Sequence, residues 1–393
     1  MPGSVIVSSA RTPIGKLSGS LASLGAPDLG GHAIAAALAR AGVSGDQVDH
    51  VILGQVLQAG AGQVPARQAA AKGGVPLSVP SKALNSACLS GMDAIYAADQ
   101  MIQSGDADIV VAGGMESMTR APYLLKDARS GYRLGHAEVF DAMLSDGLMC
   151  AFDLIHMGES TERRTAELGG ITRDRQDEIA AKSHERAANA AKDGRLGEIA
   201  PVEIPQRRGD PILVDSDEGI RPGTTTDSLG SLRAAFAADG TITAGNASQI
   251  SDGGAAVVMM SRAKADDLGI EPLAELISFA TVAGPDTSLM HQPSNATRRA
   301  LDKVGLTIGD VDLFEINEAF AAVGLASMLD MGITDEVVNV NGGAIALGHP
   351  IGMSGARIVL TLVDELRRRG GGVGAASLCG GGGQGEASIV RVL

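Results

Sequence analysis

The sequence has few aromatic residues and few cysteines. Six Phe and three Tyr are its only aromatic residues among 393, and Trp is absent, so the core has to be built from Ala, Val, Leu, Ile and Met. Small side chains let helices and sheets approach closely, which favours a layered α/β protein over a β-sandwich with aromatic anchors. Three cysteines cannot form a disulfide framework, and their spacing fits no zinc motif. We therefore expect a reducing, cytoplasmic location and no metal site.

The sequence also lacks a basic block, a long apolar run and a signal peptide. Its 32 Lys and Arg against 46 Asp and Glu give a net charge of −14, which excludes nucleic acid and anionic membranes as expected partners. No run of 18 apolar residues is present, so no transmembrane helix is expected. The first fifteen residues are typical of a short strand and loop rather than of a leader. A hydrophobic content of 45% excludes intrinsic disorder, and the length suggests two or three structural units.

One pattern recurs at the two ends of the chain. Residues 37–43 (ALARAGV) match residues 300–306 (ALDKVGL) at an offset of 263, and a Val-Asp pair follows each match at the same offset. A Ser-Gly pair that begins at Ser90 recurs at Ser354, at an offset of 264. Helix, glycine turn, strand and Gly-rich helix start therefore recur in order, which indicates two copies of one α/β unit.

Hydrophobic periodicity and glycine positions predict the elements inside this framework. The expected elements are, in chain order, a helix ending at Gly42, a strand over 50–53, a helix from Cys88 to Gly105, a strand over 108–114, a helix near 173–193, a strand over 255–260, a helix through 358–366 and a strand over 374–378.

The middle of the chain has no counterpart in either copy. Residues 119–249 hold most of the polar, Arg-rich sequence, and we interpret them as a loop domain inserted between the two halves. The predicted organisation is a first half over 1–118 and 250–272, the loop domain over 119–249, and a second half over 273–393.

Cys88 is a candidate nucleophile because of its position. It lies in NSACLSG, where an extended segment meets a helix. Unpaired N–H groups and the positive end of the helix dipole favour a thiolate there. The alternative is a buried structural cysteine, the commoner fate of a free Cys, and the residue alone leaves both interpretations open.

Three other segments carry side chains suited to chemistry. Cys379 opens CGGGG, where the absence of Cβ atoms lets backbone N–H groups approach a ligand, although a plain turn is an equal alternative. His349 precedes Pro350, which favours a loop conformation, and a loop His between glycines is expected to have few neighbours to bury it. Asn317 follows the repeated strand, at the carboxyl end where parallel sheets bind ligands. If the two copies pack about a pseudo-twofold axis, these side chains and Cys88 face one crevice.

Four motifs, in this order along the chain, resemble those of the thiolase family: NSACLSG, NEAFA, GGAIALGHPIGMSGAR and CGGGG. The similarity extends across the whole chain. It implies a five-layer α-β-α-β-α core from two repeated halves with an inserted loop domain. The implied reaction is acetoacetyl-CoA + CoA ⇌ 2 acetyl-CoA, with acyl-CoA and CoA as substrates, no cofactor, and a homo-oligomer that is a tetramer or a dimer.

The resemblance implies a role for each matching residue. Cys88 resembles the nucleophile that becomes acylated, His349 the base that activates it, and Cys379 the second acid/base. Asn317 resembles the residue that fixes a water, which with His349 forms one oxyanion hole, and the N–H groups of Cys88 and Gly381 resemble the second. The substrate-binding residues implied in the same way are Ser248, Arg221, His156, Met157, Phe320 and Ala319.

Two alternatives to this activity stay open. A degradative 3-ketoacyl-CoA thiolase for longer chains would have identical catalytic residues, and a non-catalytic acyl-CoA-binding relative would share the fold. Met157 resembles the residue that helps close the acyl pocket in short-chain members, which favours the four-carbon substrate. The segment 120–144 is expected to supply an oligomerisation loop. Cys150 matches no family site and is expected to be structural.

Overall fold

The computed structural model describes residues 4–392, and a mixed ten-stranded sheet runs through it. The strands of this sheet are β1 (Ser4–Arg11), β2 (Gly15–Lys16), β3 (His50–Gly54), β4 (Ser81–Leu84), β5 (Ile109–Ser117), β10 (Ser251–Ser261), β11 (Ala274–Ala283), β12 (Leu313–Ile316), β13 (Gly372–Gly380) and β14 (Gln384–Val392). Their order is β12-β13-β14-β11-β1-β10-β5-β3-β4, with β2 paired to β10.

The sheet consists of two equivalent parts joined at one short contact. In the first half β3 runs parallel to β4 and β5, and in the second half β12 runs parallel to β13. The equivalent interior strands β10 and β14 pair antiparallel with β5 and β13. The two parts meet where β1 and β11 pair antiparallel through two residue pairs, Val5 with Glu275 and Ile6 with Ala274. β10 pairs with both β1 and β5, two strands that come early in the chain.

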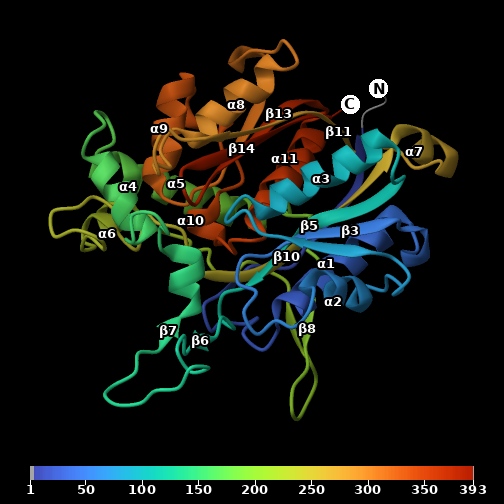
Figure 1. Cartoon of the computed structure of the whole chain (residues 1–393). Coiled ribbons are helices and arrows are strands. Elements are labelled where there is room, and N and C mark those ends of the chain that lie inside the picture. The colour runs from blue at the N-terminus through green and yellow to red at the C-terminus, as the bar shows by residue number, and fades with distance from the viewer. Residues whose placement is uncertain (1–3, 393) are drawn as a thin grey trace.

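Helices cover both outer faces of the sheet and fill the space between its two parts. The core helices are α1 (Ala26–Ala41), α2 (Pro65–Lys72), α3 (Ser90–Ser104), α8 (Gln292–Asp302), α9 (Ala321–Met331) and α11 (Ser354–Arg369). Figure 1 shows the layers from top to bottom: α8 with α9, the second-half strands, α11 with α3, the first-half strands, and α1 with α2. The predicted five-layer architecture is therefore confirmed.

Glycine sets the ends of these helices and the closeness of their packing. Gly42 and Gly105 end α1 and α3 in the left-handed conformation, with φ of 66° and 79°, as the sequence predicts. The repeat-related Gly91 and Gly355 lie where α3 and α11 cross. A Cβ on Gly355 would lie 2.5 Å from the backbone N of Met92. Small residues therefore let the two helix starts touch, and this brings the two halves of the site together.

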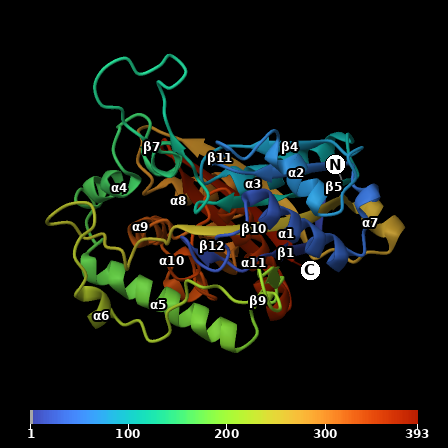
Figure 2. The ribbon, with the colours of Figure 1, turned by 90° about the horizontal axis from the view of Figure 1, so that it is seen from below.

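The segment between the halves packs beside this core. Its elements are β6 (Tyr123–Leu124), β7 (Phe140–Asp141), α4 (Met157–Thr165), α5 (Arg173–Lys192), β8 (Val202–Ile204), β9 (Ile212–Val214) and α6 (Thr226–Gly230). Two other short helices, α7 (Arg262–Leu268) and α10 (Ala344–Leu347), lie outside this segment. The chain between β6 and β7 projects from the body (Figure 2). The long helix predicted near 173–193 is confirmed as α5.

A buried ion-pair cluster attaches this segment to the core. Arg11, at the end of β1, is fully buried and contacts Glu198 at 3.2 Å and Asp217 at 2.6 Å. The Asp217 carboxylate also accepts the backbone N–H of Ile14 at 2.8 Å. Because an unpaired buried charge is costly, this cluster holds the segment firmly.

The domain limits predicted from the sequence stay a prediction. Met1–Gly3 and Leu393, which the predicted halves include, lie outside the described residues. None of the helices within 4–392 is long and apolar enough to cross a membrane.

Candidate active site

Cys88 is presented by a tight turn directly before α3. Asn85 Oδ1 accepts the N–H of Ala87 at 3.1 Å, and Ser90 Oγ accepts the N–H of Ser86 at 2.9 Å while it donates to the carbonyl of Ala87 at 2.6 Å. Ala87 has a φ of +53°, a strained conformation that persists only where the surroundings impose it. These bonds hold the Cys88 thiol in one place at the helix start.

The protonation state of Cys88 differs from the prediction. Cys88 retains partial exposure, but burial of its sulfur raises the pKa of the thiol to about 12, and the hydrogen bond from its own backbone lowers it by less. The expectation of a thiolate is therefore wrong for the protein without substrate, because burial disfavours the charged sulfur more than the helix start favours it. Cys88 rests as a thiol and needs a base before it can attack.

His349 is the candidate base and, contrary to expectation, it is buried. It lies in the loop after α10, as predicted, but is only 6% exposed, because the loop packs between the two halves. Its Nδ1 lies 2.6 Å from Ser354 Oγ, and Ser354 Oγ donates to the carbonyl of Pro350 at 3.0 Å. The hydroxyl therefore accepts from Nδ1–H, which leaves the lone pair on Nε2. Burial first, and the nearby Arg357 second, lower the pKa of His349 to about 3, so the imidazole is neutral.

Asn317 lies beside His349, at the end of β12 as predicted. Its Nδ2 is 3.4 Å from His349 Nε2, and its buried Oδ1 has no protein partner among the described residues. A buried amide oxygen without a partner is a free acceptor, and water is the usual ligand of such a group.

The end of β13 carries Cys379, and the loop that follows carries Gly381. Cys379 is buried, and burial followed by the neighbouring Cys88 raises the pKa of its thiol. A Cβ on Gly380 would lie 2.5 Å from the side chain of Leu89, and one on Gly381 would lie 3.4 Å from that of Ala87. The glycines thus let this loop rest directly on the turn that carries Cys88. Cys88 thus neighbours Cys379, Asn317 neighbours His349, and Cys88 packs against Ile351, two residues after His349.

A pocket of about 320 Å³ opens beside this cluster. Its wall includes His349 together with His156, Ser248 and Phe320, three of the residues predicted to bind substrate. The remaining lining is mainly apolar: Met118, Leu148, Ala235, Phe236, Thr243, Ala244, Ala247, Gln249, Ile250 and Ile351.

Three aromatic rings in the pocket wall pack against one another. The His156 ring stacks on Phe236 at a centroid distance of 4.8 Å, and Phe236 meets Phe320 edge-on at 6.1 Å. His156 Nδ1 accepts the backbone N–H of Gly158 at 3.0 Å, so a neutral imidazole carries its proton on Nε2. Burial lowers the pKa of His156, which keeps this ring neutral and available as a donor.

The other predicted substrate residues do not line this pocket. Ala319 is buried, and its carbonyl accepts the N–H of Ser248 at 3.1 Å. Met157 is buried at the start of α4, in the apolar cluster that also contains Phe320. Arg221 is exposed, and its backbone N–H donates to His184 Nδ1 at 3.2 Å. Cys150 is buried, with its Sγ 3.5 Å from the carboxylate of Asp153, in agreement with a structural role.

Ser354 and Phe236 are residues of the candidate site that the sequence reasoning missed. A signal for Ser354 was present, because the repeat aligns it with Ser90, and each of these serines fixes a catalytic loop in its own half. A weaker signal marked Phe236, one of six Phe in the chain.

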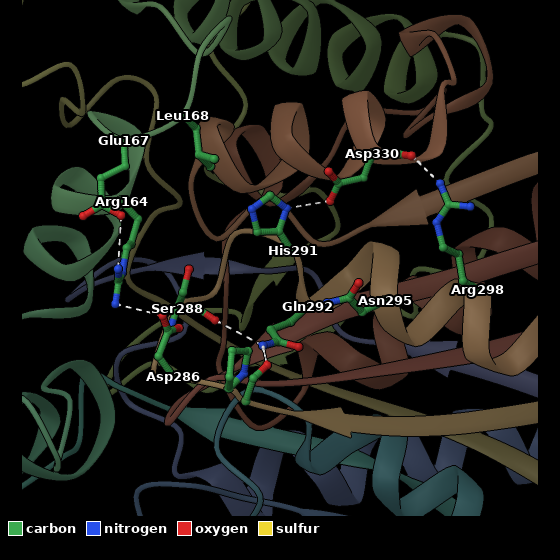
Figure 3. Close-up of a pocket in the computed structure, with 12 residues that line it drawn as sticks. Arg164, Glu167, Leu168, Asp286, Ser288, His291, Gln292, Asn295, Arg298 and Asp330 are labelled. Atoms are coloured by element: carbon green, nitrogen blue, oxygen red, sulfur yellow. Dashed lines mark hydrogen bonds and ion pairs between the residues drawn. The ribbon is translucent and has the colours of Figure 1, made fainter.

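A larger pocket, of about 520 Å³, lies elsewhere, between α4, residues 284–288, α8 and the end of α9. Figure 3 shows that its charged groups already pair with one another: His291 with Asp330 at 2.7 Å, and Arg164 with Asp286 at 2.9 Å. None of the candidate catalytic side chains lines it. Within 4–392 no three His, Cys, Asp or Glu side chains group as a metal site requires.

Comparison with known proteins defines the class to which this fold and site belong. Residues 4–263 match the N-terminal domain of thiolase, and residues 270–392 match the C-terminal domain of thiolase. The chain belongs to the thiolase family.

Relatives of known name cover the whole chain. A "probable acetyl-CoA acetyltransferase" of Mycobacterium tuberculosis is 55% identical over 392 residues, with full coverage of both chains. The acetyl-CoA acetyltransferase of Pseudomonas aeruginosa is 51% identical over 385 residues, 98% of each chain. The crystal structure of the Bacillus anthracis acetyl-CoA acetyltransferase superposes with a TM-score of 0.97 at 41% identity, covering 100% of this chain and 99% of that one.

Proposed function

We propose that this chain is an acetyl-CoA acetyltransferase that catalyses acetoacetyl-CoA + CoA ⇌ 2 acetyl-CoA through an acyl-cysteine intermediate. One observation carries the proposal: Cys88, Cys379, His349 and Asn317 meet where α3 and α11 cross, beside a largely apolar pocket. The full-length relatives with that name support it.

In the first half-reaction Cys88 takes the acetyl group. The Cys88 sulfur attacks the thioester carbonyl while its proton passes to His349 Nε2, the only ring nitrogen not already donating. The tetrahedral intermediate then collapses, and the bond to the CoA sulfur breaks. Cys379 holds its proton at neutral pH, since burial raises its pKa, and it gives this proton to the departing CoA sulfur.

In the second half-reaction a carbon–carbon bond forms. The thiolate left on Cys379 removes a proton from the methyl carbon of a second acetyl-CoA. The resulting enolate attacks the carbonyl of acetyl-Cys88, and the Cys88 sulfur leaves and recovers its proton from His349. Splitting the reaction in this way predicts ping-pong kinetics.

Charge develops on two different oxygens during this cycle, and two sets of donors are available for it. We assign the enolate oxygen to His349 and a water held by Asn317, whose Oδ1 has no protein partner in 4–392. The oxygen on acyl-Cys88 is assigned to the N–H groups of Cys88 and Gly381. Preorganised donors of this kind contribute several kcal/mol to catalysis, roughly 3–4 for each donor removed.

We also propose how the substrate is held. Ser248, fixed by the carbonyl of Ala319, contacts the pantetheine arm, and the His156 and Phe320 rings surround the thioester. Met157 supports Phe320 from behind. Arg221, exposed at the surface, is assigned to the nucleotide end of CoA, where a cation is needed in a protein of net charge −14.

We also propose an oligomeric state and a cellular location for this protein. A cytoplasmic homo-oligomer, a tetramer or a dimer, fits a chain with three unpaired cysteines. The projecting segment 123–141 carries exposed apolar side chains, with Leu134 fully exposed and Val139 57% exposed, as expected of a surface that another subunit covers.

Acetyl transfer to Cys88 tests the function directly. Brief incubation with acetyl-CoA followed by intact-mass analysis should show one added acetyl group on the Cys88 peptide. Cys379→Ser should still gain the acetyl group on Cys88 but turn over slowly. Cys88→Ala should neither gain an acetyl group nor turn over, and Cys150→Ala should behave as the unmodified enzyme. An acetyl group found only on Cys379 or Cys150 would refute the assignment.

A further inference from the structure

Glu116 is a fully buried carboxylate at the end of β5 that the mechanism above does not use. Its exposure is 0%, and it has no cationic partner within the described residues. Burial raises its pKa to about 7 despite three backbone hydrogen bonds, and Asp252 adds to the rise. A buried acid without a counter-ion is costly, so its retention needs a reason.

The three hydrogen bonds of Glu116 join segments from both halves. Oε2 accepts the N–H of Val56 at 2.9 Å and that of Gly352 at 3.1 Å, and Oε1 accepts the N–H of Leu57 at 3.2 Å. Val56 and Leu57 follow β3 in the first half. Gly352 ends the His349-Pro350-Ile351-Gly352 turn of the second half. Among residues 4–392, no other first-half side chain hydrogen-bonds to this turn.

The segment that Glu116 binds also contacts Cys88, the proposed nucleophile. Cys88 packs on the apolar cluster of Val56, Leu57 and Ile351, two of whose members belong to the segment that Glu116 holds. The negative charge of Glu116 is also one of the causes that raise the pKa of Cys88. The turn packs tightly as well: a Cβ on Gly352 would lie 2.8 Å from the Cα of Gln55, so the turn itself has little room to shift.

We infer that Glu116 is a positioning residue that sets the distance between Cys88 and His349 by binding the backbone of both halves. This inference rests on the proposed function of the site. A carboxylate has acceptor lone pairs on both oxygens and can satisfy three N–H groups at once, which the amide of glutamine, with one oxygen and one NH₂ group, cannot. Because Cys88 comes from one half and His349 from the other, a small relative shift of the halves would separate the pair.

The substitution Glu116→Gln tests this inference. Glutamine keeps the volume but replaces one acceptor oxygen with an NH₂ group that faces backbone N–H donors. The rate constant for acetylation of Cys88 by acetyl-CoA should fall about 10- to 100-fold, the loss typical of a misplacement near 1 Å. KM should change less than about threefold, because the Glu116 side chain itself does not line the pocket. Alkylation of Cys88 by iodoacetamide should change much less, falling by less than about threefold. Loss of the Glu116 charge makes the Cys88 thiolate easier to form, and this opposes any loss of alkylation rate.

A matched control and a second variant complete the experiment. Asp99→Asn alters another buried carboxylate, which binds Ser4 and Gln103 away from the site, and should leave acetylation unchanged. If Glu116→Gln is insoluble, Glu116→Asp replaces it: the charge is kept but the shorter side chain cannot reach Gly352, and acetylation should fall equally.

The outcomes separate this inference from the proposed function. Failure of the unmodified enzyme to acetylate Cys88 refutes the function. Normal acetylation in the unmodified enzyme and in the Glu116 variant refutes the positioning role alone. Acetylation and alkylation that fall together, in proportion to the loss of folded protein, also refute it.

Discussion

Removal of the Ser354 hydroxyl should slow catalysis without weakening substrate binding. Ser354 is 1% exposed, and its Oγ lies 2.6 Å from His349 Nδ1. In Ser354→Ala the buried Nδ1–H loses its acceptor, and the proton no longer has a reason to stay on Nδ1 rather than Nε2. Only the tautomer with a free lone pair on Nε2 can accept the proton of Cys88.

The magnitude follows from the burial of the bond. Leaving a buried donor without its partner costs about 1–3 kcal/mol, which corresponds to a factor of about 5 to 150 in rate. The loss should appear in kcat and in the rate of Cys88 acetylation, because Ser354 does not line the pocket. KM for acetyl-CoA should change less than about threefold.

Steady-state thiolysis and rapid-quench acetylation measure these two quantities. Ser327→Ala is the matched control, because Ser327 is equally buried but makes only a 3.5 Å bond to Met290, away from the catalytic side chains. A Ser354→Ala enzyme with normal kcat, or one whose loss lies wholly in KM, would show that the hydroxyl does not orient the base.

Three further predictions concern specificity, stability and pH. Because three packed rings line a pocket of only about 320 Å³, kcat/KM for thiolysis should fall from four- to six- and eight-carbon ketoacyl-CoA, each excluded methylene forfeiting roughly 0.8 kcal/mol. Phe236→Ala should flatten this fall more than Met157→Ala, and a level or rising series in the unmodified enzyme would favour the longer-chain alternative. Asp217→Ala should lower the free energy of unfolding in urea by about 3–5 kcal/mol, because the buried Arg11 guanidinium loses its two-point partner and keeps only Glu198. Loss of the exposed Asp28–Lys72 pair should cost under about 1 kcal/mol, and equal losses would contradict this. Burial, followed by the charge of Arg221, lowers the pKa of His184 to about 4. Between pH 6.5 and 4 the unfolded chain therefore binds more protons at this residue than the folded chain. The contribution of neutral His184 to the free energy of unfolding is present above pH 6.5 and is lost as the pH falls. His184→Gln should therefore reduce the decline in the urea midpoint across that window, and an unchanged decline would argue against a buried neutral ring.

Local features of the chain were predictable because their causes are local. Gly42 and Gly105 end their helices in a conformation that other residues rarely adopt, and the long polar helix α5 follows from periodicity. The repeat predicted that the Ser-Gly pairs at 90 and 354 would begin equivalent helices. Their direct contact across the core follows from symmetry, and it brought the catalytic motifs to one place.

The two wrong expectations both concern burial. His349 was expected to be poorly covered because glycines flank it, but it is buried, and its partners Asn317, Ser354 and Gln249 come from other segments of the fold. Cys88 was expected to be a thiolate because of its helix, but the protein around its sulfur outweighs that local field. The residues next to a side chain in the sequence do not show how deeply the folded protein buries it.

The sequence by itself determined the repeated α/β unit, the ends of its main helices and the identity of the reactive groups, because these depend on short-range pattern and on residue chemistry. Only the tertiary structure decided how those groups work. The tautomer of His349 depends on Ser354, the protonated state of both cysteines on desolvation, and the floor of the pocket on Phe236. Each of these is set by contacts between residues brought together by packing, and the strength of such contacts depends on how completely water is excluded around them.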